Sequence, residues 1–201
     1  MNSIKQAKNG YEARTLQKKE QVKKTAKTIL ETNKQGELNM DMLADLSGVA
    51  KMSIYKYFES KTGLLSEIIL KIMECENQKI IDIFNSKLPF KEKLSQYLFI
   101  KYKFFEQGYM PVLNMVIAEN PEINARFMQY RAETVKLINE LIDQGISENE
   151  IDKSISKQVI FHWMQMMLLA FEKDMPLRKK IENDASFFND FVTVFWRGLK
   201  P

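Results

Sequence analysis

One stretch of the chain, residues 39–64, constrains the fold more than any other, because it contains two short helical patterns separated by a glycine. Asn39 is a good N-cap, and the apolar residues after it fall at helical spacing, so we expect a helix of about two turns. Gly48 can take the positive φ that a tight turn between crossing helices requires. The second helix is expected over residues 50–57, with Ile54 turned inward. Close approach, a sharp bend and an apolar anchor are typical of a helix-turn-helix.

The second of these helices is expected to leave one face free. That face carries cations, hydroxyls and aromatic rings, which are groups that contact phosphates and base edges in DNA. Ser60 is a candidate N-cap for the next helix, and Lys61 then stands at its first position, where the helix dipole favours negative charge. A DNA phosphate held by the helix N-terminus and Lys61 would compensate. The predicted DNA-binding residues are Asn39, Lys51, Met52, Ser53, Tyr55, Lys56, Tyr57 and Lys61.

This stretch resembles the N-terminal domain of the TetR (tetracycline-repressor) family of transcriptional regulators. The resemblance rests on Leu43-Ala44, Ser47-Gly48-Val49, Ile54-Tyr55-Lys56-Tyr57-Phe58, Ser60-Lys61 and Leu64. It implies an all-α fold of about nine helices, with a helix-turn-helix DNA-binding domain over residues 1–62 and a helical ligand-binding and dimerisation domain over residues 63–201. It also implies a repressor that a small effector releases from its operator. Met40, Met52 and Gly63 depart from the residues that are common in the family at these positions.

The basic charge of the chain is concentrated around the same stretch. Residues 1–61 contain 12 Lys and Arg against 7 Asp and Glu, whereas the remaining residues contain 18 against 19. A basic excess on one segment is the electrostatic footprint expected of a nucleic-acid binder, although a solvated basic tail would look the same. Along the predicted helix over residues 15–33, one face carries lysines that either are solvated or approach the DNA backbone: Lys18, Lys19, Lys23, Lys24 and Lys27.

The C-terminal part of the chain is expected to be helical throughout. After Lys61 one long helix continues to about residue 84, and five more are expected over residues 90–107, after Pro111, and over residues 121–145, 156–174 and 184–199. The last two are apolar on more than one side, which a single chain of this size could not cover. We expect them to pair with their copies as a four-helix bundle in a homodimer, and such a dimer would read a palindromic DNA operator.

Methionine and phenylalanine are abundant, with 12 and 13 copies. They would suit an adaptable pocket for a hydrophobic effector, and ordinary core packing is the alternative. The lone histidine, His162, is either a core residue or a ligand-contacting group. The candidate pocket residues are Tyr97, Lys101, Phe105, Asn114, Phe127, Tyr130, His162 and Met167.

No catalytic constellation, glycine-rich phosphate loop or metal-ligand spacing is visible, so we expect no enzyme activity, no cofactor and no metal. Cys75 is the single cysteine, which rules out an intrachain disulfide and favours a reducing compartment. No apolar run reaches the ~18 residues of a membrane span and no signal-peptide core is present, so we expect a cytoplasmic protein without membrane contact. The alternative function is a helical ligand-binding or adaptor protein that uses its helix-turn-helix for protein contacts.

Overall fold

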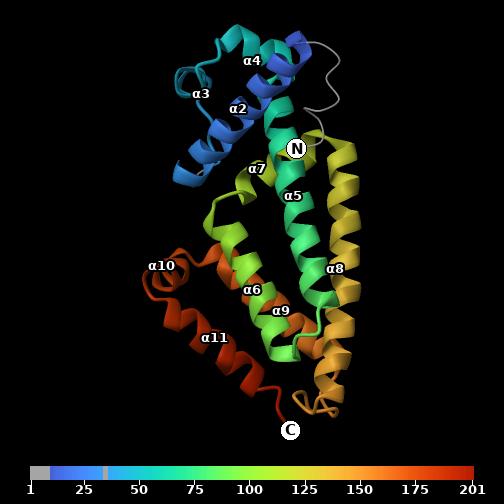
Figure 1. The fold of residues 1–201 in the computed structure, drawn as a ribbon. Helices are drawn as coiled ribbons and strands as arrows, with labels where there is room; N and C mark the ends of the chain where they lie inside the picture. Colours follow the sequence, from blue (N-terminus) through green and yellow to red (C-terminus); the bar gives the residue numbers. More distant parts are fainter. Residues whose placement is uncertain (1–9, 34–35) are drawn as a thin grey trace. The chain divides into compact units, whose positions relative to one another are not determined.

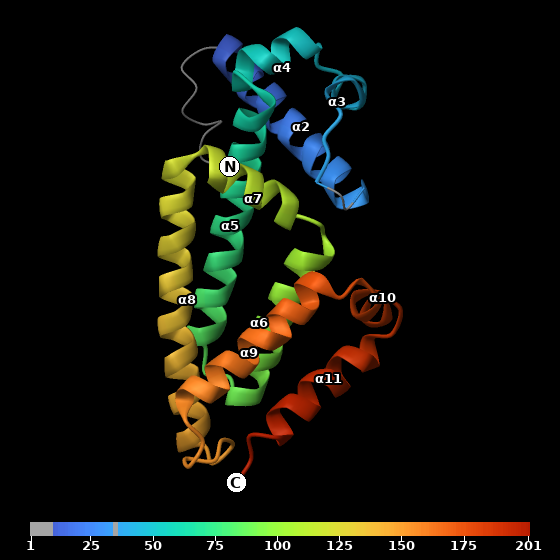
Figure 2. The same cartoon turned by 180° about the vertical axis from the view of Figure 1, so that it is seen from behind.

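The computed structural model describes residues 10–33 and 36–201, and these ranges are helical and contain no strand (Figures 1 and 2). The predicted all-α fold class is therefore confirmed. The described residues form ten helices: α2 (Gly10–Asn33), α3 (Met40–Ser47), α4 (Lys51–Phe58), α5 (Lys61–Asn85), α6 (Phe90–Glu106), α7 (Met110–Glu119), α8 (Pro121–Ser147), α9 (Lys157–Lys173), α10 (Met175–Asn183) and α11 (Ala185–Arg197).

The predicted set of about nine helices lacked α10, which lies between α9 and α11 in the sequence. The Asp174 side chain caps this helix by accepting a hydrogen bond from the Leu177 N–H at 2.9 Å, and Pro176 stands in its first turn. Asn120 and Pro121 provide the same kind of start signal for α8, where the prediction was made. The prediction lacked α10 because this helix is short and mostly polar, with Met175, Leu177 and Ile181 as its large apolar residues.

The chain divides into two compact units. One comprises the described part of Met1–Ile72 together with Gln107–Ile123, and the other comprises Met73–Glu106 together with Asn124–Pro201. The helix α5 begins in the first unit and ends in the second without interruption. The first unit thus holds α7 in addition to the helix-turn-helix, and the functional boundary after residue 62 stays a prediction.

The first unit has a core that α2, α3 and α4 form together. Leu30 on α2, Leu43 on α3 and Ile54 on α4 are fully buried, as are Leu64 and Leu65 at the start of α5. Each of these residues belongs to the apolar stripe along one side of its helix. Burial of these stripes against one another holds the unit together. Burying a side chain of this size contributes about 1.5–3 kcal/mol relative to leaving it exposed.

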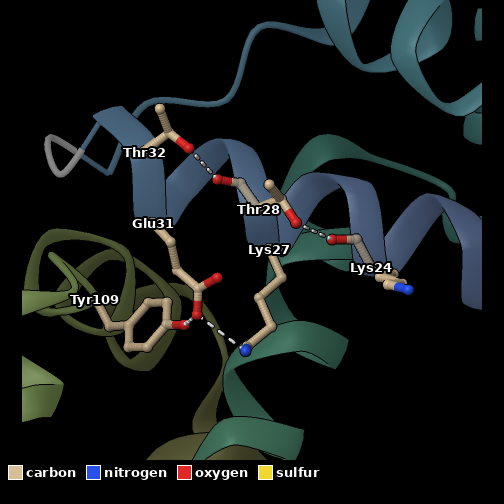
Figure 3. A network of polar contacts seen from close by, with 6 residues as sticks. All are labelled: Lys24, Lys27, Thr28, Glu31, Thr32 and Tyr109. Carbon is tan, nitrogen blue, oxygen red and sulfur yellow. Dashed lines mark hydrogen bonds and ion pairs between the residues drawn. The ribbon is translucent and has the colours of Figure 1, made fainter.

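Two contacts near the start of α7 attach it to the rest of the first unit, and Figure 3 shows the first, which is made by its N-cap residue Tyr109. The hydroxyl of buried Tyr109 donates a hydrogen bond to the Glu31 carboxylate on α2, and Lys27 binds the same carboxylate at 2.9 Å. Gly36, which has a φ of +75°, lies so close to Pro111 that a Cβ on the glycine would stand 2.8 Å from the proline Cβ. Because Tyr109 and Glu31 are 78 residues apart, no local pattern indicates this attachment.

The second unit is built around an aromatic cluster that joins three helices. The Tyr102 ring of α6, the Phe171 ring of α9 and the Phe188 ring of α11 lie with centroids 5.8–6.1 Å apart. Buried Lys93 of α6 donates hydrogen bonds to a backbone carbonyl at the end of α5 and to the Gln144 side chain of α8, each at 2.8 Å. The aromatic cluster joins α6, α9 and α11, and the hydrogen bonds of Lys93 join α6 to α5 and α8.

Candidate nucleic-acid interface

The helix-turn-helix forms by the local interactions that the sequence predicts. The Asn39 side chain accepts hydrogen bonds from the backbone N–H groups of Asp41 at 2.9 Å and Met42 at 3.1 Å, which caps α3. Gly48 ends α3 in the left-handed region at a φ of 63°, and Ile54 anchors α4 in the core. Asn39 therefore has a structural role as a cap, and its contact with DNA stays a prediction.

The helix α4 presents a continuous outer face. Ile54 and Phe58 are buried and attach the helix to its unit. The other predicted contact residues on α4 point away from this core to differing degrees: Lys51, Met52, Tyr55 and Lys56 are exposed, and Ser53 and Tyr57 are half-buried. Six of the eight predicted DNA-binding residues thus share one eight-residue helix, and their contact with DNA remains to be tested.

Lys51 is not a free cation in this arrangement. Its Nζ lies 2.7 Å from Asp41 Oδ1, so the pair links the first turn of α4 to the first turn of α3. The hydrogen bond to Asp41 raises the pKa of the Lys51 ammonium above its ordinary value, and the lysine stays charged at neutral pH. Among the described residues, neither Lys56 nor Lys61 forms an ion pair. Lys56 on α4 and Lys61 at the start of α5 are therefore cations that no carboxylate of the described residues balances.

The junction between α4 and α5 explains why residue 63 is a glycine. Ser60 caps α5 by accepting a hydrogen bond from the Gly63 N–H at 2.9 Å, and exposed Lys61 is the first residue of the helix, as predicted. Glu59 turns the chain with a positive φ of 65°. This turn brings the Phe58 carbonyl oxygen to within 2.2 Å of the place that a Cβ on Gly63 would occupy. Any larger residue at position 63 must displace backbone.

We expect Gly63→Ala to lower the free energy of unfolding by about 1–3 kcal/mol, because the added methyl group overpacks a site bounded by backbone. Urea denaturation of the full chain measures this. Gly10→Ala is the matched control, since a Cβ at Gly10 meets nothing within 4 Å and a change there should stay within about 0.5 kcal/mol. Equal stability of the two variants would contradict the close approach at Gly63.

Several lysines along α2 have partners within the protein. Lys23 Nζ lies 2.5 Å from Glu20 and 3.3 Å from Glu67, and the Lys19 ammonium lies 5.5 Å from the centre of the Phe58 ring. Burial by itself would lower the pKa of Lys23, but the two carboxylates outweigh it and raise that pKa above its ordinary value. These contacts favour a structural role for this part of the lysine face over a role at the DNA backbone.

The eight predicted pocket residues do not share one environment. Tyr97 is buried, and burial together with Glu76 raises the pKa of its phenol above the ordinary value. Lys101 forms an ion pair with Glu76 at 2.9 Å. The remaining ones divide by exposure: Met167 is buried, Phe105, Phe127 and Tyr130 are half-buried, and Asn114 and His162 are exposed.

His162 is exposed in this chain, so the expectation that it is a core histidine is wrong. Its ring lies outside the core, and its Nδ1 is 2.7 Å from the Gln158 carbonyl oxygen one turn earlier on α9. The reason is that α9 packs on α6 with its other face, where Ile160, Met164 and Met167 are buried. The apolar neighbours of His162 in the sequence therefore lie partly on an outward surface.

The second unit contains a hollow of about 600 Å³ between the end of α5, α6, α10 and α11. Over it, Lys103 Nζ lies 5.7 Å from the Phe99 ring centre and 5.5 Å from that of Tyr102. The sequence prediction missed the hollow because α10, which forms one of its walls, was not foreseen. None of the eight predicted pocket residues lines it: its walls are Ile83, Ser95, Gln96, Phe99, Ile100, Tyr102, Lys103, Glu106, Ile181, Glu182, Phe188 and Asn189.

In the ranges 10–33 and 36–201, none of the helices combines the length and the apolar character needed to cross a bilayer. Over the same residues, no group of three or more His, Cys, Asp and Glu side chains is placed to hold a metal ion.

A capped helix-turn-helix whose second helix has an exposed outer face is the arrangement found in helix-turn-helix DNA-binding proteins. Residues 35–68 match the bacterial regulatory proteins of the tetR family. A curated relative, the uncharacterized HTH-type transcriptional regulator YhgD of Bacillus subtilis (strain 168), is 26% identical over 145 residues, which are 68% of this chain and 75% of that protein. These matches support the prediction of a TetR-family transcriptional regulator.

Solved structures show the same fold at low sequence identity. The ketosteroid transcriptional regulator KstR2 of Mycobacterium tuberculosis superposes with a TM-score of 0.67 at 13% identity, over 91% of this chain and 95% of that one. The transcriptional regulator FadR from Bacillus subtilis, in complex with stearoyl-CoA, superposes with a TM-score of 0.57 at 16% identity, over 89% and 98% of the two chains. The matched family and the curated relative are transcriptional regulators, which supports the prediction that the chain is not an enzyme.

Proposed function

We propose that the protein is a cytoplasmic, homodimeric repressor that binds a palindromic operator and is released by a small hydrophobic effector. The observation that carries the DNA-binding part is the outer face of α4, where Met52, Tyr55 and Lys56 are exposed while Ile54 and Phe58 hold the helix in place. Lys61 at the start of α5 adds a cation without an ion-pair partner among the described residues. Base edges would be read by α4, and a phosphate would be bound at Lys61.

An apolar outer surface supports the proposed homodimer. Val159, Met166 and Leu169 of α9 are 54–65% exposed, and Val194 of α11 is 72% exposed. On α9 these residues and Trp163 recur at spacings of three and four, so they form one stripe on the helix. An apolar stripe of this extent is costly in water, and pairing with the same stripe of a second copy would bury it in a four-helix bundle. Two recognition helices related by a twofold axis would then read a palindrome.

The hollow beside α6 supports the proposed effector binding. Its aromatic walls, among them Phe99 and Phe188, suit an apolar body, and Lys103 and Glu182 at the same site can bind polar groups. Two proteins of the same fold are a ketosteroid transcriptional regulator and a regulator solved with stearoyl-CoA, which favours an apolar effector here as well. The helix α5 is continuous from Lys61 to Asn85, so we propose that an effector acts on DNA binding through this helix.

The test of this function is fluorescence anisotropy of the purified protein on duplexes selected from random sequence, across a salt series. The proposal expects sequence-selective binding at two chains per duplex, with an affinity that falls steeply with salt. Weak binding of equal strength to every duplex would overturn it and favour the adaptor function.

Lys61→Ala is expected to weaken binding to all duplexes alike and to reduce the slope of log affinity against log salt by about one, because one phosphate contact is lost. Lys136→Ala is the control, since Lys136 is a strongly exposed lysine on α8 in the second unit. An unchanged salt slope in Lys61→Ala would exclude the phosphate contact.

Lys56→Ala is expected to act differently, by changing the order of preference among duplexes, because Lys56 lies on the outer face of α4. Competition between a selected operator and single-base variants measures the preference. Equal weakening on every duplex would assign Lys56 to the backbone instead of to a base.

A further inference from the structure

The most exposed large apolar side chain among the described residues is Met52, in the first turn of α4, with 82% of its surface accessible. An exposed methionine contributes nothing to the folded core, and its neighbours on α4 carry hydroxyl or ammonium groups. An isolated exposed apolar residue is ordinary on most surfaces. Met52, however, lies on the face of α4 that the proposed function places against the edges of base pairs. The chemical groups on those base edges therefore decide what Met52 can contact.

Met52 is more exposed than the residues beside it at the start of α4, Lys51 and Ser53. Lys51 is drawn to Asp41 at 2.7 Å, and the cap position Ala50 has no side chain that could accept a hydrogen bond. Tyr55, one turn further on the same face, is 38% exposed. The first residues of a recognition helix are those that contact base edges in the major groove.

Only one base offers an apolar group to such a side chain. In the major groove each base pair displays hydrogen-bond donors and acceptors, and thymine alone adds a methyl group at C5. The thioether chain of methionine has neither a strong donor nor a charge, but it is flexible and polarizable and so can pack on a methyl group. Any other base edge facing Met52 would lose hydrogen bonds to water without replacement.

The geometry points to Met52 as a specificity-determining residue that selects thymine at one position of each operator half-site by contact with its C5-methyl group. This inference rests on the proposed function, because it requires α4 to lie in the major groove. It adds to that function the base that the first turn of α4 reads, and it predicts that the selected operators share a thymine at one symmetric pair of positions.

Replacement of thymine by deoxyuridine, which removes only the methyl group, tests the inference. Each thymine pair of a selected operator is replaced in turn, and wild type, Met52→Ala and Met42→Ala are titrated on each duplex by anisotropy. Wild type is expected to lose about fourfold per half-site, hence about 16-fold in all, at one symmetric position. Met52→Ala is expected to bind the thymine and deoxyuridine duplexes equally at that position. Met42 is also an exposed methionine of this unit, and Met42→Ala should keep the loss.

The outcomes separate this inference from the function on which it rests. If no selected duplex is bound selectively, the proposed function and the inference fall together, before any deoxyuridine is used. If binding is selective but Met52→Ala discriminates thymine from deoxyuridine as wild type does, the inference alone is overturned. A wild type that is indifferent to deoxyuridine at every position overturns it as well. Circular dichroism of the variants verifies that the helices are intact.

Discussion

Met166→Asp is expected to leave the protein monomeric and to lower its affinity for a palindromic operator by about 10²–10⁴-fold. Met166 is 65% exposed in the apolar stripe on α9, so in the proposed dimer it would face the partner chain. Two aspartates brought together in an apolar interface would repel each other and lose water without compensation. Each monomer would then bind a half-site alone and lose the effective concentration that the dimer provides.

Sedimentation velocity and operator anisotropy measure the two parts of this prediction. Met128→Asp is the matched control, because Met128 is also an exposed methionine, at 55%, but lies on α8 away from α9 and α11 in the sequence. It should remain dimeric and bind the operator as wild type does. A Met166→Asp protein that remains dimeric would show that α9 does not form the interface, and dissociation of both variants would point to α8.

Phe171→Ala is expected to lower the free energy of unfolding by about 3–5 kcal/mol, which is the usual cost of removing a buried phenylalanine side chain. Phe171 is fully buried, and its ring contacts those of Tyr102, Phe188 and Phe191 at centroid distances of 5.6–6.1 Å. The cavity would open between the three helices that these rings join, so the site cannot collapse without moving α9 or α11.

Chemical denaturation monitored by far-ultraviolet circular dichroism measures the stability of this variant. Met128→Ala, on an exposed site, should change it by no more than about 0.5 kcal/mol. Because the proposed dimer forms through α9 and α11, we also expect Phe171→Ala to weaken dimerisation. A loss of less than 1 kcal/mol would mean that the cluster is loosely packed.

Local sequence signals predicted the helix-turn-helix well. Asn39 caps α3, Gly48 turns the chain at a positive φ, and Ile54 is buried, because each depends on residues within a few positions. The same kind of signal was present at Asp174 and Pro176, where α10 begins. The prediction did not include α10, which is short and mostly polar.

The candidate binding surfaces were predicted less completely. The prediction that Lys51 faces DNA did not foresee its pairing with Asp41, which lies on the preceding helix. The pocket residues were chosen for their chemistry, and composition does not say which face of a helix turns inward. The hollow beside α6 is instead lined by Phe99, Lys103 and residues of α10 and α11. Such a surface depends on how four separate segments pack.

The all-helical fold and the capped helix-turn-helix, with its resemblance to TetR-family regulators, follow from the amino-acid sequence, because helices, caps and turns arise from interactions between near neighbours in the chain. Tertiary structure alone decided that α7 joins the first unit through Tyr109 and Glu31, and that Gly63 must lack a side chain beside the Phe58 carbonyl. It also decided which apolar residues stay exposed on α4, α9 and α11. These features come from the packing of distant segments or from the exact path of the backbone, which no local pattern of residues specifies.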